Sequence, residues 1–199
     1  FADQIRTRMP VERILRPPGK PVSVAFRNGQ TREFDEVVIA THSDEALAML
    51  GDPTEDERSV LGALPYRDNE VILHTDTRLL PKLQRAWSSW NYRLKPGSGR
   101  ATVTYNMNIL QGIDAPETFC VTLNDTASIN PHRILGRFNY AHPQFTLAGM
   151  KAQQRWGDIN GLNGTWFCGA YWQNGFHEDG LSSGLRVAES LCAARQMAA

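Results

Sequence analysis

The residues best suited to chemistry lie near the end of the chain, where glycines and two carboxylates surround a predicted helix start. Thr165 to Tyr171 reads as a strand that ends in a glycine turn, and a loop leads from it to Glu178-Asp179-Gly180, where the helix opens. Free N–H groups at a helix start attract electron-rich groups, and Gly180 would let a ligand come close. This arrangement is typical of a nucleotide-cofactor site.

The helix expected after Gly180 presents one apolar face. Its apolar residues recur at helical spacing, at Leu181, Leu185, Ala188 and Leu191. Asp179 or Glu178 occupies the N-cap position in this prediction, where a carboxylate accepts hydrogen bonds from free backbone N–H groups. Capping alone, contact with a ligand, or both are compatible with these two side chains.

Two stretches of the sequence follow the pattern of one known superfamily. Phe167 to Gly169 and Gly175 to Gly184 resemble the carboxy-terminal flavin-binding motif of the FAD-dependent amine oxidases and phytoene desaturases. Pro10 to Ile14, followed by Phe34 to Thr41, resembles that superfamily's order of elements. The two matches bracket the chain with the spacing of the carboxy-terminal half of such an enzyme. The resemblance is closest to bacterial predicted NAD/FAD-binding amine-oxidase-like proteins.

The resemblance implies FAD as the cofactor and a role for several backbone groups. The backbone at Gly169 and Ala170 would approach the ribityl and pyrophosphate, and the N–H groups of Gly180 and Leu181 would face the flavin. The cofactor-binding residues implied in this way are Val11, Gly169, Ala170, Gly175, Glu178, Asp179, Gly180 and Leu181. Val11 matches a position whose backbone pairs with adenine. Ala170 departs from the pattern, because many members carry an acidic residue there that holds a ribityl hydroxyl.

Aromatic residues next to this motif are candidates for substrate contact. Tyr171 and Trp172 lie in the segment that would pass the flavin, where aromatic side chains of amine oxidases guide a neutral amine to the ring. Core packing is the alternative explanation for both. No residue is assigned as a catalytic base.

One element of a complete dinucleotide site is absent from the sequence. These flavoproteins hold the ADP half of FAD with a G-x-G-x-x-G turn after their first strand. No such string occurs, and Gly97-Ser98-Gly99 lacks the third glycine. Because the chain also begins at Phe1, we expect a fragment or a separately expressed half, whose partner is the amino-terminal dinucleotide-binding half. An exposed apolar face on such a half would favour a homodimer.

Composition excludes several classes of function. The 199 residues are 41% apolar, which is ordinary for a globular chain, and 21 basic residues balance 21 acidic ones. This balance argues against a nucleic-acid partner. No apolar run reaches the roughly 20 residues of a membrane span, and no signal peptide opens the chain, so we expect a cytoplasmic protein.

The cysteines and histidines show no metal-binding spacing. Cys120, Cys168 and Cys192 lie far apart in apolar contexts, which predicts buried free thiols. The five histidines form no H-x-x-x-H pair, so no metal site is predicted.

The predicted fold class is α+β, with an antiparallel substrate-domain sheet, helices and partial FAD-domain segments. Val22 to Phe26 and Phe34 to Ala40 are predicted strands joined by an Asn-Gly turn, and a helix is expected over residues 145–156. On the resemblance, residues 1–45 and 157–199 belong to the FAD-binding domain and residues 46–156 to the substrate-binding domain.

The predicted function is that of a fragment of an FAD-dependent oxidoreductase, which transfers a hydride from a C–N or C–C bond to FAD. The isolated chain would be inactive. The alternatives are a lipid-type desaturase or isomerase and a non-catalytic binding module. Gly180 to Gly184 also satisfies G-x-S-x-G, but a hydrolase is disfavoured because the expected strand ends well before Ser182 and no Asp or His follows it.

Overall fold

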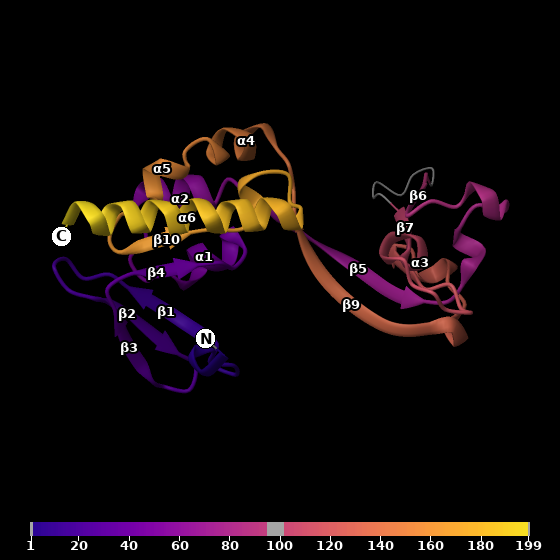
Figure 1. Cartoon of the computed structure of the whole chain (residues 1–199), viewed down its shortest axis with the longest axis horizontal. Helices are drawn as coiled ribbons and strands as arrows, with labels where there is room; N and C mark the ends of the chain where they lie inside the picture. The colour runs from indigo at the N-terminus through magenta and orange to yellow at the C-terminus, as the bar shows by residue number, and fades with distance from the viewer. Residues whose placement is uncertain (1, 95–101, 199) are drawn as a thin grey trace. The chain divides into compact units, whose positions relative to one another are not determined.

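The chain forms two compact units in a computed structural model that describes residues 2–94 and 102–198 (Figure 1). Unit 1 comprises Phe1–Tyr66 and Pro143–Ala199, and unit 2 comprises Arg67–His142. The sequence pattern Gly97-Ser98-Gly99 lies outside the described residues. Helices and mainly antiparallel strands make up both units, so the predicted α+β class is confirmed.

Unit 1 contains two small sheets. The antiparallel sheet consists of β1 (Val11–Leu15), β2 (Val22–Phe26) and β3 (Thr31–Phe34). The parallel pair consists of β4 (Val37–Ile39) and β10 (Thr165–Phe167). The predicted hairpin turn is present, with Gly29 at φ 82° and its N–H bonded to the Phe26 carbonyl at 2.9 Å.

The single strand predicted from Phe34 to Ala40 is wrong. The chain bends at Asp35, so β3 ends in the hairpin and β4 starts a different sheet. The physical reason is partner choice: β3 pairs with β2, whereas β4 pairs with β10 from the other end of the chain. An apolar run does not reveal such a change of partner.

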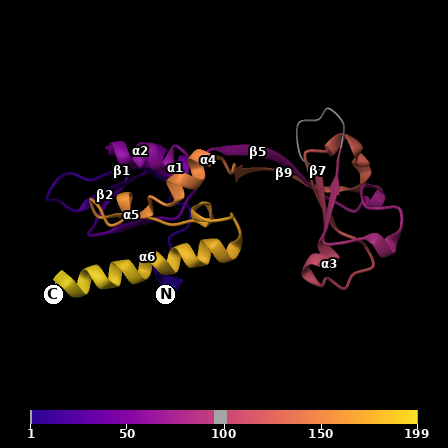
Figure 2. The same ribbon diagram turned by 90° about the horizontal axis from the view of Figure 1, so that it is seen from above.

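Unit 1 also contains several helices (Figure 2). They are α1 (Ser43–Met49), α2 (Glu55–Leu61), α4 (Leu147–Gln153), α5 (Trp156–Ile159) and α6 (His177–Ala198), with the short 3-10 helices η1 (Ala2–Gln4) and η6 (Ala170–Trp172). The one helix expected over residues 145–156 is therefore two. Thr54 and Glu57 form a capping box at the start of α2.

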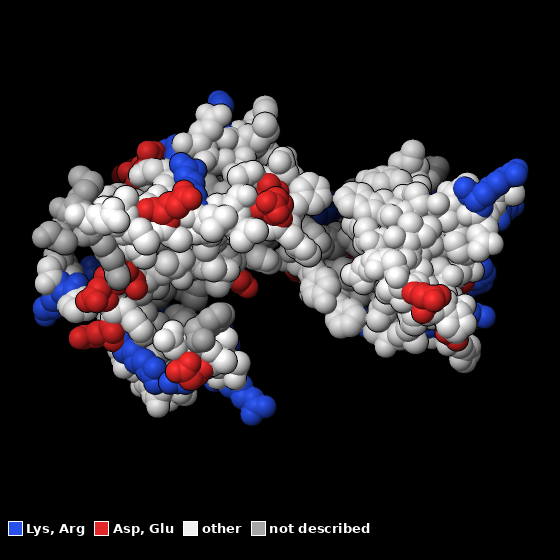
Figure 3. All heavy atoms as spheres, in the orientation of Figure 1, with Lys and Arg blue, Asp and Glu red and all other residues white. Residues whose placement is uncertain are grey.

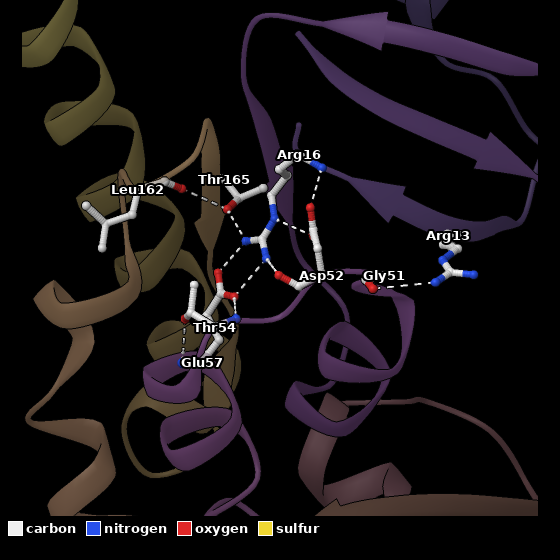
Figure 4. A network of polar contacts seen from close by, with 8 residues as sticks. All are labelled: Arg13, Arg16, Gly51, Asp52, Thr54, Glu57, Leu162 and Thr165. Atoms are coloured by element: carbon white, nitrogen blue, oxygen red, sulfur yellow. Dashed lines mark hydrogen bonds and ion pairs between the residues drawn. The ribbon is translucent and has the colours of Figure 1, made fainter. Parts of the chain in front are cut away.

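A buried ionic network lies beside the apolar core of unit 1 (Figure 4). Arg16 follows β1 and pairs with Glu57, and the side chains are 2% and 1% exposed. The Arg16 guanidinium also donates to Thr165 Oγ1 at 3.0 Å, and its Nε donates to Asp52 Oδ1 at 3.0 Å. Burial lowers the Arg16 pKa, but hydrogen bonds and charge attraction from Glu57, then Asp52, outweigh it and leave the pKa raised. The network joins β1, α2 and β10.

Unit 2 is built on a five-stranded sheet in the order β6-β7-β8-β5-β9. Its strands are β5 (Tyr66–His74), β6 (Trp90–Arg93), β7 (Thr102–Asn106), β8 (Cys120–Leu123) and β9 (Ile134–Pro143). The remaining elements are α3 (Met107–Gln111) and the 3-10 helices η2 (Thr77–Leu79), η3 (Gln84–Ala86), η4 (Thr126–Ser128) and η5 (Pro131–Arg133). The chain enters this unit along β5 and leaves along β9.

The compact units divide at other positions than the expected domains. Residues 46–66 and 143–156 pack in unit 1, rather than with the five-stranded sheet of unit 2. Val60 and Leu61 of α2 share one apolar cluster with Ala152 of α4 and Trp156 of α5, and this shared core holds them in unit 1. Which unit serves the cofactor and which serves the substrate stays a prediction.

Candidate functional site

The two parallel strands of unit 1 end at the same edge. Val37 pairs with Thr165 and Ile39 with Phe167, and the Cys168 N–H donates to the Ile39 carbonyl at 3.1 Å. The residues after both strands therefore leave the sheet side by side. Ligands of parallel sheets bind outside the carboxyl ends of the strands. This edge is the candidate site.

Gly169 makes the turn after β10. Its φ of 156° is backbone that L side chains rarely adopt, and its N–H donates to Ser183 Oγ at 3.1 Å. Ser183 is buried on α6 and thereby ties the turn to the helix. A Cβ on Gly180 would lie 3.8 Å from the Ala170 backbone nitrogen, so α6 packs closely beside this turn. Sequence reasoning missed Ser183, which looks like any other helix residue.

The start of α6 differs from the prediction. The helix begins at His177, so neither Glu178 nor Asp179 is the N-cap. The Gly180 N–H is not free, because it donates to the Phe176 carbonyl at 3.1 Å. The N–H groups that a helix leaves unpaired are those of its first turn, which here starts at His177. A contact between Gly180 or Leu181 and a cofactor stays a prediction.

Asp179 holds the loop before α6. Its Oδ2 accepts the Phe176 N–H at 2.8 Å and the Asn174 N–H at 3.2 Å, and the residue is buried. Glu178 next to it is exposed. The capping alternative therefore describes Asp179, although it acts from inside the helix. Gly175 turns the same loop at φ 88°, and its N–H donates to the Ala170 carbonyl at 3.1 Å.

Tyr171 and Trp172 lie in the apolar core of unit 1, 3% and 7% exposed. The Trp172 Nε1 donates to the Phe167 carbonyl at 3.1 Å, while the Tyr171 hydroxyl finds no hydrogen-bond partner among the described residues. Burial raises the Tyr171 pKa, so its phenol stays protonated. This burial favours the packing explanation, and substrate contact stays a prediction for both residues.

Val11 lines a cavity of about 690 Å³ at the carboxyl end of β4. Ile39, Ala40 and Thr41 form the wall next to the strand end, and Arg27 also lines the cavity. The other lining residues are Glu12, Ile14, Val24, Val37, Val38, Glu45, Ala48 and Met49. The structure places Val11 in one cavity with the end of β4, and a contact between its backbone and adenine stays a prediction. Sequence reasoning missed Arg27 and Glu45, since they come from a hairpin turn and a helix.

The buried face of α6 is not the face that the sequence predicts. Val187 and Ser183 face the core, whereas Leu181 and Leu185 are 58% and 54% exposed. The expected apolar face is exposed at Leu181, Leu185 and Ala188, whereas Leu191 packs partly against the core. Val38 in the middle of β4 is also exposed, at 45%. Strands of parallel sheets are normally covered on both faces, so Val38 and the two leucines are exposed apolar positions that a further part of a protein could cover.

Several competing chemistries find no support in the described residues. Ser182 lies within α6, well beyond the end of β10, so the nucleophile elbow of a hydrolase is not formed. Over residues 2–94 and 102–198, no group of three His, Cys, Asp or Glu side chains is placed to hold a metal ion. No helix in the same ranges has the length and apolar character needed to cross a membrane.

The three cysteines are free thiols, but they are not all buried. Cys120 and Cys168 are buried, whereas Cys192 is exposed on α6. The prediction of three buried thiols is therefore wrong for Cys192, which lies one helical turn beyond Ala188 on the side of α6 that carries the exposed leucines. Burial raises the pKa of the Cys168 thiol, which makes it a poor nucleophile.

Comparison with protein families gives a match over nearly the whole chain. The family of flavin containing amine oxidoreductases matches residues 2–192. A comparison with curated protein sequences finds no match.

Solved structures share the fold. A CLA-producing fatty acid isomerase from P. acnes has a TM-score of 0.60 and 16% identity, over 89% of this chain and 46% of its own. A cyclohexylamine oxidase from Brevibacterium oxydans IH-35A has a TM-score of 0.62 and 12% identity, over 98% of this chain and 50% of its own. A putative protoporphyrinogen oxidase from Exiguobacterium sp. 255-15 has a TM-score of 0.61 and 12% identity, over 92% of this chain and 46% of its own. This chain spans about half the length of these proteins.

Proposed function

Because this chain belongs to the family of flavin containing amine oxidoreductases, we propose that it supplies the carboxy-terminal half of an FAD-dependent oxidoreductase. The observation that carries the proposal is the parallel pair β4 and β10: β4 ends at the cavity that Val11 lines, and the turn after β10 is bonded to α6 through Ser183. FAD, when bound, supplies the redox chemistry and takes up a hydride from the C–N or C–C bond of a small substrate.

The residues at this edge fit a dinucleotide. The cavity beside Val11, Ala40 and Thr41 would hold the adenosine end, with the Val11 backbone against adenine. The turn at Gly169 and Ala170 would face the ribityl and pyrophosphate through its backbone. Since Ala170 has no carboxylate, helix-start N–H groups carry more of this contact than in many family members. The 22-residue α6 directs the positive end of its dipole there.

The proposed partner is an amino-terminal dinucleotide-binding half that covers Val38 and the α6 leucines. Both apolar positions are exposed, and the solved structures with this fold are about twice as long. Burying them against a further half removes apolar surface from water. Without that half, the chain would be inactive.

The proposed substrate is a small amine, in accordance with the family's description. Neither a lipid-type desaturase or isomerase nor a non-catalytic module is favoured by this family. A cytoplasmic location and a homodimer remain predictions from the sequence.

Retention of flavin tests the cofactor site. FAD is added to the purified chain and to the full-length enzyme, and visible flavin absorbance is followed through gel filtration. We expect the full-length enzyme to retain FAD and Ala40→Trp to lose it, because the new ring fills the cavity at an exposed wall position. Ala127→Trp on η4 adds the same ring at an exposed position of unit 2 and should retain FAD. Equal retention by Ala40→Trp would show that the cavity holds no part of FAD.

Activity tests the reaction. Oxygen consumption by the full-length enzyme is measured with a panel of primary amines and with unsaturated acyl substrates. Turnover of an amine supports the proposal. Turnover of acyl substrates alone would show that the enzyme acts on C–C bonds and not on C–N bonds. If flavin is retained but neither panel is turned over, the oxidoreductase assignment fails.

A further inference from the structure

A second cavity lies in unit 2, at the edge strand β6. Its volume is about 560 Å³, and it is walled by Arg78 to Lys82 on one side and by Trp90 to Arg93 on the other. This size is within the range of pockets for small molecules, ~300–1,000 Å³. All of its lining residues belong to unit 2, and none of them lines the cavity at Val11.

The cavity combines cations with flat apolar surface. Arg78, Lys82 and Arg93 line it, and so do the rings of Trp90 and Tyr92, which are 54% and 64% exposed. The surrounding sequence is strongly biased, because no acidic residue occurs between Asp76 and Asp114. The basic residues of that stretch are Arg78, Lys82, Arg85, Arg93, Lys95 and Arg100. Basic side chains also stand out on the visible surface of unit 2 (Figure 3).

Arg78 and Arg93 are each paired with a buried carboxylate. Arg78 Nη2 lies 2.5 Å and its Nε 2.9 Å from the carboxylate of Asp76, which is 2% exposed. Arg93 Nη1 lies 3.7 Å from the buried carboxylate of Asp125. A guanidinium has five N–H donors, so such pairing orients it and leaves donors for a second anion. Lys82 adds a charge for which the structure shows no carboxylate partner among the described residues.

The two walls are held in place by hydrogen bonds. Trp87 Nε1 donates to the Pro81 carbonyl at 2.8 Å and fixes the loop that carries Lys82. Asn91 Nδ2 donates to the carbonyls of Ser88 at 2.6 Å and Thr104 at 3.2 Å, which fixes β6 from its buried side. The cavity is therefore formed before any ligand arrives, which lowers the entropy lost on binding.

We propose that this cavity binds a small organic anion, a carboxylate or phosphate attached to an aromatic or similarly flat group. The anionic group meets Lys82, Arg78 and Arg93, and the flat group stacks on Trp90 or Tyr92. Charge-assisted hydrogen bonds give the affinity for the anion. The rings select against inorganic ions, which have no flat surface to bury.

Titration with phenyl phosphate tests the proposal in the full chain. Binding is measured by calorimetry and by the indole N–H signal of Trp90, which Trp90→Phe assigns. Inorganic phosphate tests the contribution of the ring, and benzyl alcohol tests that of the charge. We expect phenyl phosphate to bind more tightly than either, and to shift the Trp90 signal.

Lys82→Gln and Arg85→Gln form a matched pair of variants. Both residues are exposed and lose one positive charge, but only Lys82 lines the cavity. Lys82→Gln should weaken the binding of phenyl phosphate about tenfold, which is the effect of losing one hydrogen bond to a charged group. Arg85→Gln should bind as the parent does.

Three results would overturn the proposal. One is equal weakening by both variants, which would mean diffuse attraction to the basic segment. Another is binding of benzyl alcohol as tight as that of phenyl phosphate, and the third is no binding at millimolar concentration. None of these results bears on flavin retention in unit 1.

Discussion

Units 1 and 2 each bury a polar network, but the two networks are of different kinds. In unit 1 the network is ionic and joins distant parts of the chain: Arg16 contacts Thr165, which is 149 positions away. In unit 2 an imidazole and two hydroxyls join neighbouring strands: His74 Nε2 lies 2.8 Å from Thr122 Oγ1, which lies 2.8 Å from Thr104 Oγ1. The network of unit 1 links the two chain segments that make up that unit, whereas the network of unit 2 links strands of one sheet.

The apolar surroundings of the two networks differ as well. The unit 1 network lies beside a large cluster that includes Phe167, Leu61 and Trp166. In unit 2 the apolar cluster is formed by Ile72, Leu79 and Ile129 with Ile134 packed against them. We therefore expect hydrogen bonds to contribute a larger share of the stability of unit 2 than of unit 1. This difference predicts distinct responses to substitution and to pH.

The largest effect is expected at Glu57 in unit 1. Glu57→Gln leaves the buried Arg16 with Asp52 as its remaining carboxylate, and should lower the free energy of unfolding by about 3 kcal/mol. Glu55→Gln, an exposed change in the first turn of the same helix, is the control. Urea unfolding gives the loss, and hydrogen exchange should place it in β1, α2 and β10. A loss of the same size in Glu55→Gln would contradict this reading.

A smaller effect is expected at Thr122 in unit 2. Thr122→Val removes the hydroxyl between His74 and Thr104 and leaves buried polar atoms unpaired, at a cost of about 1–3 kcal/mol. Thr122→Ser retains the hydroxyl and should recover most of this stability. The comparison is made by urea unfolding with hydrogen exchange in β7 and β8. If the serine variant is as unstable as the valine variant, methyl packing and not hydrogen bonding explains the loss.

Unit 2 should also lose stability as the pH falls below neutrality. Burial lowers the pKa of His74, despite the opposing effects of Asp76. The unfolded chain then takes up a proton near its ordinary pKa of about 6.5 that the folded chain does not bind, so stability falls as the pH drops below that value. The slope for one group is at most about 1.4 kcal/mol per pH unit.

His74→Gln is expected to flatten the stability of unit 2 between neutral and mildly acid pH, measured by hydrogen exchange in β5. His132→Gln changes an exposed histidine of the same unit and should leave the slope unchanged. An unchanged slope in His74→Gln would assign the pH dependence to another group.

The smallest effect is expected at a surface ion pair of unit 1. Arg155 contacts Asp56 at 2.6 Å and Asp158 at 2.7 Å, and its side chain is 39% exposed. Arg155→Gln should lower stability by less than about 1 kcal/mol, and less still at high salt. Thermal unfolding at two salt concentrations checks this. If Arg155→Gln loses as much stability as Glu57→Gln, burial does not explain the difference in strength between the ion pairs of Arg16 and those of Arg155.

The sequence alone determined features that depend on near neighbours. The Asn-Gly hairpin turn, the glycine turn at Gly169 and the resemblance to flavin containing amine oxidoreductases follow from local residue types and spacing. Such features involve residues a few positions apart, so their physical cause is written in the sequence itself.

Tertiary structure decided which surfaces meet. Helical spacing showed that Leu181 and Leu185 share a face, but only the fold showed that this face is exposed while Val187 packs in the core. The partner of β4 and the burial of Tyr171 were decided in the same way. Burial and pairing depend on segments that are distant in the chain, and a periodic pattern records a side chain's polarity without recording what covers it.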